Sequence, residues 1–262
     1  TDVEFLYINS IQKSDLDASG SDDLDYTGET KFNFFQINSN TLLPVGKFNI
    51  IFDNSYWDRE YINGSEIDNY ESSSNHLKSV YIYKNNLIDN VIGYDYVDYS
   101  AYFKNRGSYN SSVDKKAYQN SLFYNTDFKL KNQAVISAGY NINDNSHFKK
   151  QNSYRLGALY KLKNLNLFSS YSTGYKNPTL YEMYGADNFG YEGNPDLKPE
   201  KSFNSELGLR FTNKKINSEL SIYETFIKDM ITYSNSTYSN DLNDSSNMKG
   251  FDLKFDTYFN KF

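Results

Sequence analysis

Five aspartates lie close together near the start of the chain, and carboxylates at this density can bind a hard cation. They are Asp15, Asp17, Asp22, Asp23 and Asp25. Calcium takes six to eight oxygen ligands, and several carboxylates within about a dozen residues can supply them. Their spacing differs from that of an EF-hand loop, and a solvated acidic loop is the alternative interpretation. The cluster is therefore a candidate calcium site whose ligand set stays open.

A second candidate site consists of large aromatic side chains at or beyond the ends of the expected strands. They are Trp57, Tyr61, Tyr181, Tyr184, Phe189 and Tyr191. Rigid rings offer a large contact area at a low entropic cost, which suits a bulky ligand. The alternative is that these rings pack against their own loops or anchor the chain at a membrane surface.

The sequence contains no arrangement of residues that is typical of catalysis. It has two histidines, His76 and His147, and no cysteine. A hydrolase at a membrane surface would need a serine and a histidine together on the rim of one strand, whereas Ser146 and His147 fall in an expected loop. We therefore expect that the protein is not an enzyme.

The composition allows a membrane protein and argues against a nucleic-acid partner. The chain has 262 residues, 26 tyrosines, 19 phenylalanines and a net charge of −6. A phosphate backbone requires a basic face, which this charge does not provide. The mean hydropathy is −0.74. The sequence contains no run of 18 apolar residues, so it predicts no transmembrane helix. Strands of a membrane barrel expose only every second residue to lipid, so a low mean hydropathy is compatible with them.

Strand-like segments recur along the whole chain and are joined alternately by short and long connections. We expect twelve strands, at about 2–11, 30–38, 46–57, 73–84, 87–99, 116–130, 133–143, 152–162, 164–174, 201–212, 215–230 and 247–259. Several short connections contain asparagine, which tolerates a positive φ. The long ones span 12–29, 58–72, 100–115, 144–151, 175–200 and 231–246. Short turns at one end and long loops at the other are typical of an antiparallel transmembrane β-barrel.

The strands also alternate between an apolar and a polar face. In 201–212, Phe203, Leu207, Leu209 and Phe211 share one face, and Glu206 and Arg210 lie on the other. Polar faces that carry charge need a wet interior, because an unpaired charge is costly to bury. The apolar faces are therefore expected to contact outer-membrane lipid. A soluble β-rich binding module is the competing interpretation.

Several motifs resemble those of the TonB-dependent outer-membrane transporters. Tyr171 to Tyr184 and Gly193 to Ser202 resemble the family's Y-S-T-x-[FY]-[KR]-x-P-x-L-x-E-[LM]-Y and G-N-P-x-L-x-P-E-[KR]-S segments. Asn143 to Phe148 is similar to its D-D-N-S-x-F loop, and Lys249 to Leu253 to its K-G-[VF]-E-L strand start. The ordered likeness spans roughly 140–255. Within the family, the vitamin B12 (cobalamin) transporters are the most similar by these motifs.

The resemblance implies active import of a bulky nutrient across the outer membrane of a Gram-negative bacterium. The expected ligand is cobalamin or a related corrinoid, and the expected energy source is the TonB–ExbB–ExbD complex acting on a plug domain. Cobalamin transporters use outer-loop aspartates to bind calcium, which implies that role for Asp15 and its neighbours. A ferric siderophore receptor of the same family and a passive porin-like channel are the alternatives.

The family's barrel has about 22 strands, and neither all of these nor the plug fits in 262 residues. The segment before Phe262 also lacks the apolar alternation of a final barrel strand. Residues 1–262 are therefore expected to be an internal, partial barrel.

Overall fold

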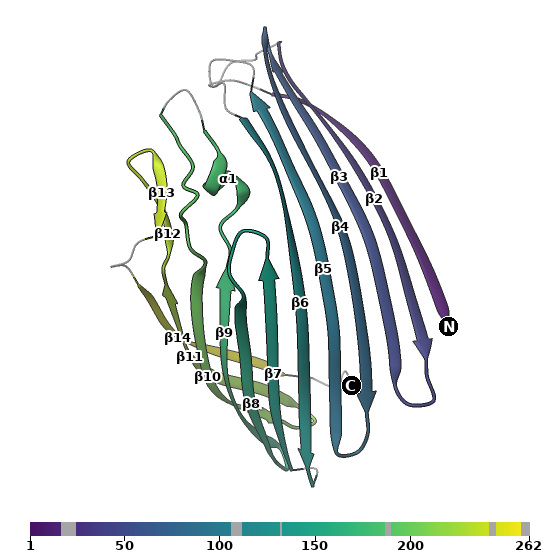
Figure 1. Ribbon diagram of the computed structural model, residues 1–262. Coiled ribbons are helices and arrows are strands. Elements are labelled where there is room, and N and C mark those ends of the chain that lie inside the picture. Colours follow the sequence, from purple (N-terminus) through teal and green to yellow (C-terminus); the bar gives the residue numbers. More distant parts are fainter. Residues whose placement is uncertain (17–24, 106–111, 132, 187–189, 241–244, 258–262) are drawn as a thin grey trace, which may run out of the picture.

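The computed structural model describes residues 1–16, 25–105, 112–131, 133–186, 190–240 and 245–257, and its main feature is one curved sheet (Figure 1). Twelve strands follow one another in chain order across this sheet, each antiparallel to the next. They are β1 (Asp2–Asp15), β2 (Tyr26–Leu42), β3 (Lys47–Asn63), β4 (Glu66–Lys84), β5 (Ile88–Asn105), β6 (Ser112–Leu130), β7 (Ala134–Asn145), β8 (Gln151–Leu162), β9 (Leu165–Lys176), β10 (Glu200–Thr212), β11 (Ile216–Lys228) and β14 (Ser246–Thr257). The predicted twelve-stranded antiparallel meander is confirmed.

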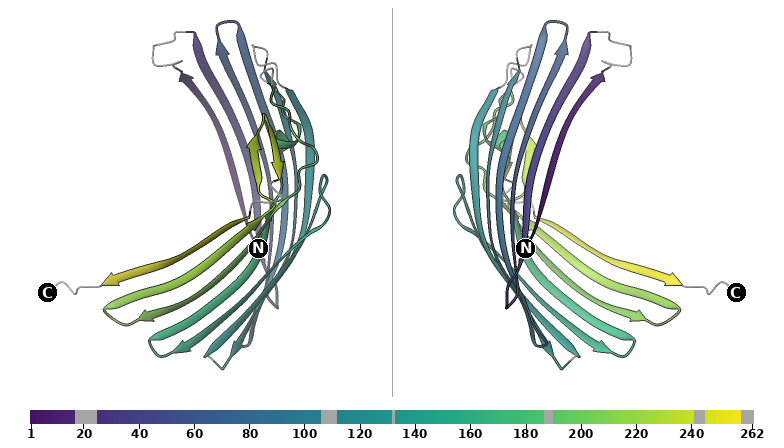
Figure 2. Two further views of the ribbon diagram at one scale, coloured as in Figure 1. Left: turned by 90° about the vertical axis from the view of Figure 1, so that its left-hand side faces the viewer. Right: turned by 90° about the vertical axis from the view of Figure 1, so that its right-hand side faces the viewer.

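The sheet bends as a wall does around a barrel axis, and β1 and β14 form its two edges (Figure 2). Short turns join the strands at one end, and two of these turns have the same pattern of hydrogen bonds from an asparagine side chain. Asn85 Oδ1 accepts hydrogen bonds from the backbone N–H groups of Leu87 and Ile88, at 2.8 and 2.7 Å. Asn213 does the same for the residues two and three positions further on. This side-chain capping explains why asparagine occurs at these turns.

The strands β1 to β6 continue well beyond the predicted boundaries. The segments 58–72 and 100–115 were predicted as long loops, but β3 and β4 are joined by a tight turn at Gly64, whose φ is +57°. β5 likewise extends to Asn105. In the loop predicted at 12–29, the residues up to Asp15 belong to β1 and those from Tyr26 onward belong to β2. The outward residues of these extensions include Asp58, Glu60 and Glu71. The outward face is therefore suited to water here, so the outward apolar residues that marked the strands end although the hydrogen-bonded ladder continues.

One face of the sheet carries the expected apolar belt. Leu122, Leu156 and Leu207 are each more than half exposed on it, at 52%, 54% and 57%. The cross-strand register places Leu207 between Ser169 and Ile222, and Leu209 between Leu167 and Leu220. So many exposed apolar side chains on one face need a lipid environment. No helix of the described residues is long and apolar enough to cross a membrane.

The opposite face is polar, as predicted, and several of its charged side chains are paired with one another. Arg210 contacts Glu219 at 2.6 Å across β10 and β11. His76 lies between two carboxylates, 2.9 Å from Asp53 and 3.2 Å from Asp95. These groups need a hydrated surface or a polar neighbour, so this face is the inner one.

The long connection between β9 and β10 folds back onto the inner face of β6 instead of standing free. This connection was predicted as a long loop over 175–200, and it contains one short helix, α1 (Leu180–Tyr184). Its capping box is complete, because Thr179 and Glu182 exchange hydrogen bonds between side chain and backbone. Leu180, Met183 and Leu197 pack against Ala117 of β6 and form the small core of this segment.

A hairpin also lies where only a long loop was predicted, over 231–246. Its strands are β12 (Ile231–Ser234) and β13 (Thr237–Asn240), joined through Asn235 and Ser236 at positive φ. Asn240 exchanges hydrogen bonds with the backbone of Lys198, at 2.6 and 2.9 Å. The hairpin lies beside the α1 segment and holds it through these hydrogen bonds (Figure 1).

An arginine in place of Leu207 is expected to lower the free energy of unfolding by about 2–4 kcal/mol, because the residue lies midway along a lipid-facing strand. Thermal or denaturant unfolding of the full-length receptor in lipid measures the change. Glu206→Arg on the inner face is the matched control and should cost far less. Equal destabilisation by the two variants would contradict the assignment of faces.

Candidate ligand site

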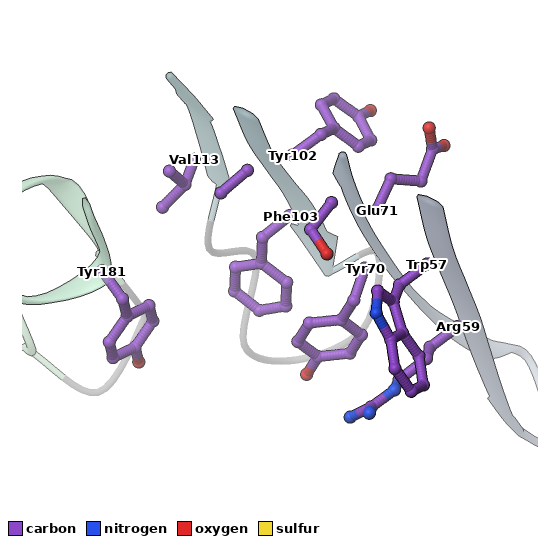
Figure 3. A pocket seen from close by; sticks show the side chains of 10 residues that line it. Trp57, Arg59, Tyr70, Glu71, Tyr102, Phe103, Val113 and Tyr181 are labelled. Carbon is purple, nitrogen blue, oxygen red and sulfur yellow. The ribbon is translucent and has the colours of Figure 1, made fainter. Parts of the chain in front are cut away.

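A hollow of about 380 Å³ opens on the inner face, beyond the end of the apolar belt. Its side chains come from four neighbouring strands and from α1. They are Trp57 and Arg59 of β3, Tyr70 and Ser72 of β4, Ala101 and Phe103 of β5, Val113 of β6 and Tyr181 of α1. Glu71 and Tyr102 also border it, although their side chains point toward the opposite face (Figure 3).

Strand register explains why these residues meet. Arg59, Tyr70, Phe103 and Val113 are successive partners in one row across β3 to β6. The next row contains Trp57 followed by Ser72 and Ala101. Because Ser72 and Ala101 are small, they leave the space beside the indole ring that becomes the hollow.

The rings of the hollow form a nearly continuous aromatic wall (Figure 3). Tyr70 and Phe103 are stacked with centroids 4.3 Å apart, and Phe103 meets Tyr181 edge-on at 6.3 Å. At the far end, Trp57 lies 4.2 Å from Phe32. Rings at these separations favour flat aromatic or conjugated ligands.

A second hollow of about 810 Å³ adjoins the first and shares Trp57, Ser72, Ala101 and Tyr181 with it. Its wall is rich in neutral hydrogen-bonding groups, among them Ser55, Ser74, Gln119 and Asn177. The hydroxyl oxygens of Ser55 and Ser74 are 2.9 Å apart. Together the two hollows offer an aromatic surface beside a hydroxyl and amide surface.

Two tyrosines of the site stay protonated at neutral pH. Burial raises the pKa of Tyr70 to about 12, helped by the charge of Asp68. Burial also raises the pKa of Tyr191 above its ordinary value, and the Tyr191 hydroxyl donates a 2.7 Å hydrogen bond to the carbonyl oxygen of Tyr181. Tyr70 can therefore act as a neutral donor and is a poor phenolate ligand for a metal.

The structure brings four of the predicted aromatic residues together. Trp57 and Tyr181 line the hollow. Tyr61 borders it through Tyr70, 5.9 Å away, and Tyr191 stacks behind Tyr181 at 5.0 Å. Trp57 was predicted at the end of a strand and Tyr61 in the long connection 58–72. The prediction for Tyr61 is wrong, because both residues lie within β3.

Tyr184 lies apart from the aromatic wall. Its hydroxyl is 3.2 Å from His147 Nδ1, and the ammonium of Lys115 lies 4.9 Å from its ring centroid. Phe189 lies outside the described residues. Both remain predictions as ligand contacts.

The predicted calcium cluster is only partly visible. Asp17, Asp22 and Asp23 lie outside the described residues. Asp15 ends β1, and Asp25 directly precedes β2; both are exposed and flank the connection that holds the other three. In the described part of the chain, no three His, Cys, Asp or Glu side chains are placed to hold a metal. Carboxylates suit calcium as donors, so the prediction stands as a proposal.

The sequence reasoning missed Arg59, Tyr70 and Phe103. A usable signal was present, because Trp57, Arg59 and Tyr61 alternate with Asp58 and Glu60 in strand period. Extending the expected strand 46–57 by six residues would have placed Trp57, Arg59 and Tyr61 on one face of it.

The whole sheet matches one protein family, described as "TonB dependent receptor-like, beta-barrel", over residues 5–262. The Vibrio vulnificus protein "Vitamin B12 transporter BtuB" is 32% identical over 139 residues, which cover 52% of this chain and 22% of that relative. The Neisseria meningitidis "Hemoglobin-haptoglobin utilization protein B" is 27% identical over 237 residues, covering 78% of this chain and 27% of the relative. The chain thus spans about a quarter of these relatives' lengths.

The fold agrees with solved receptors. The Serratia marcescens hemophore receptor HasR, solved with its hemophore HasA and heme, superimposes with a TM-score of 0.76 at 11% identity. The match covers 97% of this chain and 50% of HasR. At that identity the likeness concerns the fold alone, and it identifies the twelve strands as about half of such a barrel. The chain therefore belongs to the TonB-dependent receptor β-barrel family, whose members are transporters of the Gram-negative outer membrane and not enzymes.

Proposed function

We propose that this chain is part of the barrel of a receptor that imports cobalamin or a related corrinoid. The observation that carries the proposal is the pair of adjoining hollows, one aromatic and one lined with neutral hydroxyl and amide groups. A corrinoid combines a large conjugated ring with neutral amide side chains, which are complementary to the two surfaces. The partial identity to a vitamin B12 transporter supports the same ligand.

Charge separates this proposal from its main alternative. A ferric siderophore of the catecholate type carries several negative charges, which need several cations around them. The two hollows contain one inward-pointing cation, Arg59, among their described lining residues. The longer but weaker identity to a haemoglobin-utilisation protein makes haem the other ligand to test.

Binding to the full-length receptor, purified in detergent, tests the proposal. Cobalamin, haem and a ferric catecholate siderophore are titrated by calorimetry or by quenching of tyrosine and tryptophan fluorescence. Cobalamin is expected to bind most tightly. Trp57→Ala and Tyr181→Ala should each raise its Kd roughly fivefold, because one ring contact is worth about 1 kcal/mol.

Phe168→Ala is the matched control, since its ring lies on the inner face of β9 outside both hollows. Its Kd for cobalamin should equal that of the wild type. Binding of the siderophore or haem without binding of cobalamin would move the protein to a sister class of the family.

Calcium is proposed as a second component of the receptor. Neutralising charge with Ca²⁺ lets carboxylates converge, so Ca²⁺ is expected to bind at the connection between β1 and β2 and to tighten ligand binding. The double variant Asp15→Asn and Asp17→Asn should bind the metal more weakly in calorimetry. Asp252→Asn with Asp256→Asn, on β14, is the control. An absence of Ca²⁺ heat, with ligand affinity unmoved by a chelator, would refute this proposal.

A further inference from the structure

Arg59 stands at one end of the aromatic wall with a charge that the surrounding groups do not neutralise. Its guanidinium lies 5.2 Å from the centroid of the Trp57 ring. Its neighbours in the cross-strand row are neutral, Thr30 on β2 and Tyr70 on β4. The side chain is exposed. Across the described residues, none of the ion pairs includes Arg59.

The acids that flank Arg59 along β3 belong to the other face of the sheet. Asp58 and Glu60 flank Arg59 on β3 and therefore point outward, where Asp58 lies 3.7 Å from Lys31. Glu71 also points outward and accepts a 3.3 Å hydrogen bond from the hydroxyl of Tyr56. Asp68 of β4 lies on the inner face, paired with Tyr61 in the next cross-strand row of that face, and forms none of the ion pairs of the described residues. Strand geometry thus separates the arginine from the carboxylates closest to it in sequence.

The other end of the sheet offers a contrast, because an arginine on the same face there is paired with a carboxylate. Arg210 of β10 is held by Glu219 at 2.6 Å, and Lys254 also approaches this glutamate at 3.7 Å. The guanidinium of Arg210 is therefore paired within the sheet. Arg59 instead rests on an aromatic ring, with its hydrogen-bonding edge directed toward the hollow (Figure 3).

A guanidinium in this setting is suited to bind an anion. Its planar fork of N–H groups matches two oxygens of a carboxylate or phosphate. Stacking on Trp57 limits its freedom, so less entropy is lost when the anion binds. The Tyr70 hydroxyl extends to the same side of the hollow and is a neutral donor available to the same group (Figure 3).

We propose that Arg59 forms an anion subsite, and that the imported ligand carries one phosphate diester or carboxylate at the edge of its ring system. This inference rests on the proposed function and adds the orientation of the ligand. The ring lies along Phe103, Tyr70 and Trp57, and its anionic substituent reaches the Arg59 end. For a cobalamin, the group is the phosphate diester of its nucleotide loop, which cobinamide lacks.

The test compares cobalamin and cobinamide on the full-length receptor and its Arg59→Gln and Arg59→Lys variants. Arg59→Gln should raise the Kd for cobalamin about tenfold, as expected for loss of a charge-assisted hydrogen bond. Arg59→Lys, which keeps the charge but loses the fork, should raise it by a smaller factor. Neither variant should change the Kd for cobinamide. Added salt should weaken cobalamin binding to the wild type more than to Arg59→Gln.

Arg155→Gln is the matched control, because Arg155 is an exposed arginine on the inner face of β8, outside the hollow. It should leave both affinities unchanged. An equal loss of cobalamin and cobinamide binding in Arg59→Gln would overturn the anion subsite while keeping the corrinoid function.

Failure of the wild type to bind either corrinoid would instead refute the proposed function. Haem and a ferric catecholate siderophore then take the place of the corrinoids, since both carry anionic groups on ring systems. Whichever of them binds must lose affinity in Arg59→Gln for the anion subsite to stand. Binding that is insensitive to Arg59→Gln, or no binding of any of these ligands, overturns it.

Discussion

Uptake of the ligand is expected to stop in cells that lack TonB, while binding of the ligand to the same cells continues. Binding needs the contacts of the hollow between β3, β4, β5 and α1, and these contacts form without any energy source. Release into the cell requires the ligand to leave contacts that favour binding, and accumulation against a gradient requires work. In the proposed receptor, TonB–ExbB–ExbD supplies this work by acting on a plug domain.

The experiment follows labelled cobalamin in cells that carry the complete gene, with and without TonB. Surface-bound label should be equal in both strains, and internal label should fall to the level of cells without the receptor. An uncoupler of the inner membrane should reproduce the TonB-deficient result. Uptake that proceeds equally without TonB would identify a passive channel and refute the importer.

Local patterns predicted most of the sheet because lipid and water impose opposite demands on the two faces of a strand. The alternation of Leu207 and Leu209 with Glu206 and Arg210 is sufficient to place β10 and to orient it. Asn85 and Asn213 marked short turns for a related reason, since their side chains replace the missing ladder hydrogen bonds. Beyond the apolar belt the outward face becomes polar, so the outer thirds of β3, β4 and β5 were predicted as loops.

The site was harder to predict because its members meet through register rather than through sequence spacing. Trp57 and Tyr181 were identified as aromatic residues suited to ligand contact. Phe103, which lines the same hollow, lies on β5, whereas Trp57 lies on β3 and Tyr181 on α1. The pairing of Arg59 with Tyr70 and of Tyr70 with Phe103 depends on turn lengths and strand extensions that local patterns did not determine. One element was within reach, since the spacing of Thr179 and Glu182 is that of a capping box and α1 begins there.

The position of Tyr181 depends on a very small core, and a charge placed in that core is expected to release the whole segment. Met183 is 2% exposed and packs with Leu180, Leu197 and Ala117. In Met183→Asp, an uncompensated carboxylate would be buried at a cost on the order of 3–5 kcal/mol. The three buried side chains that remain, Ala117, Leu180 and Leu197, cannot offset that cost, so α1 should leave the wall of β6. The twelve-stranded sheet should stay folded, because its own hydrogen bonds do not involve Met183.

Hydrogen exchange of the full-length receptor in detergent measures this release directly. Amides of 180–197 should lose protection in Met183→Asp, including that of Asn194, which donates a 2.9 Å hydrogen bond to the carbonyl oxygen of Glu182. The Kd for the ligand should rise at least as much as in Tyr181→Ala, since Tyr181 leaves the hollow together with the helix. Met183→Leu, which keeps the apolar volume, and Met248→Asp, at a 53% exposed position on β14, should behave as the wild type. Full protection of 180–197 in Met183→Asp would mean that the hairpin β12–β13 and its hydrogen bonds to Lys198 hold the segment without the core.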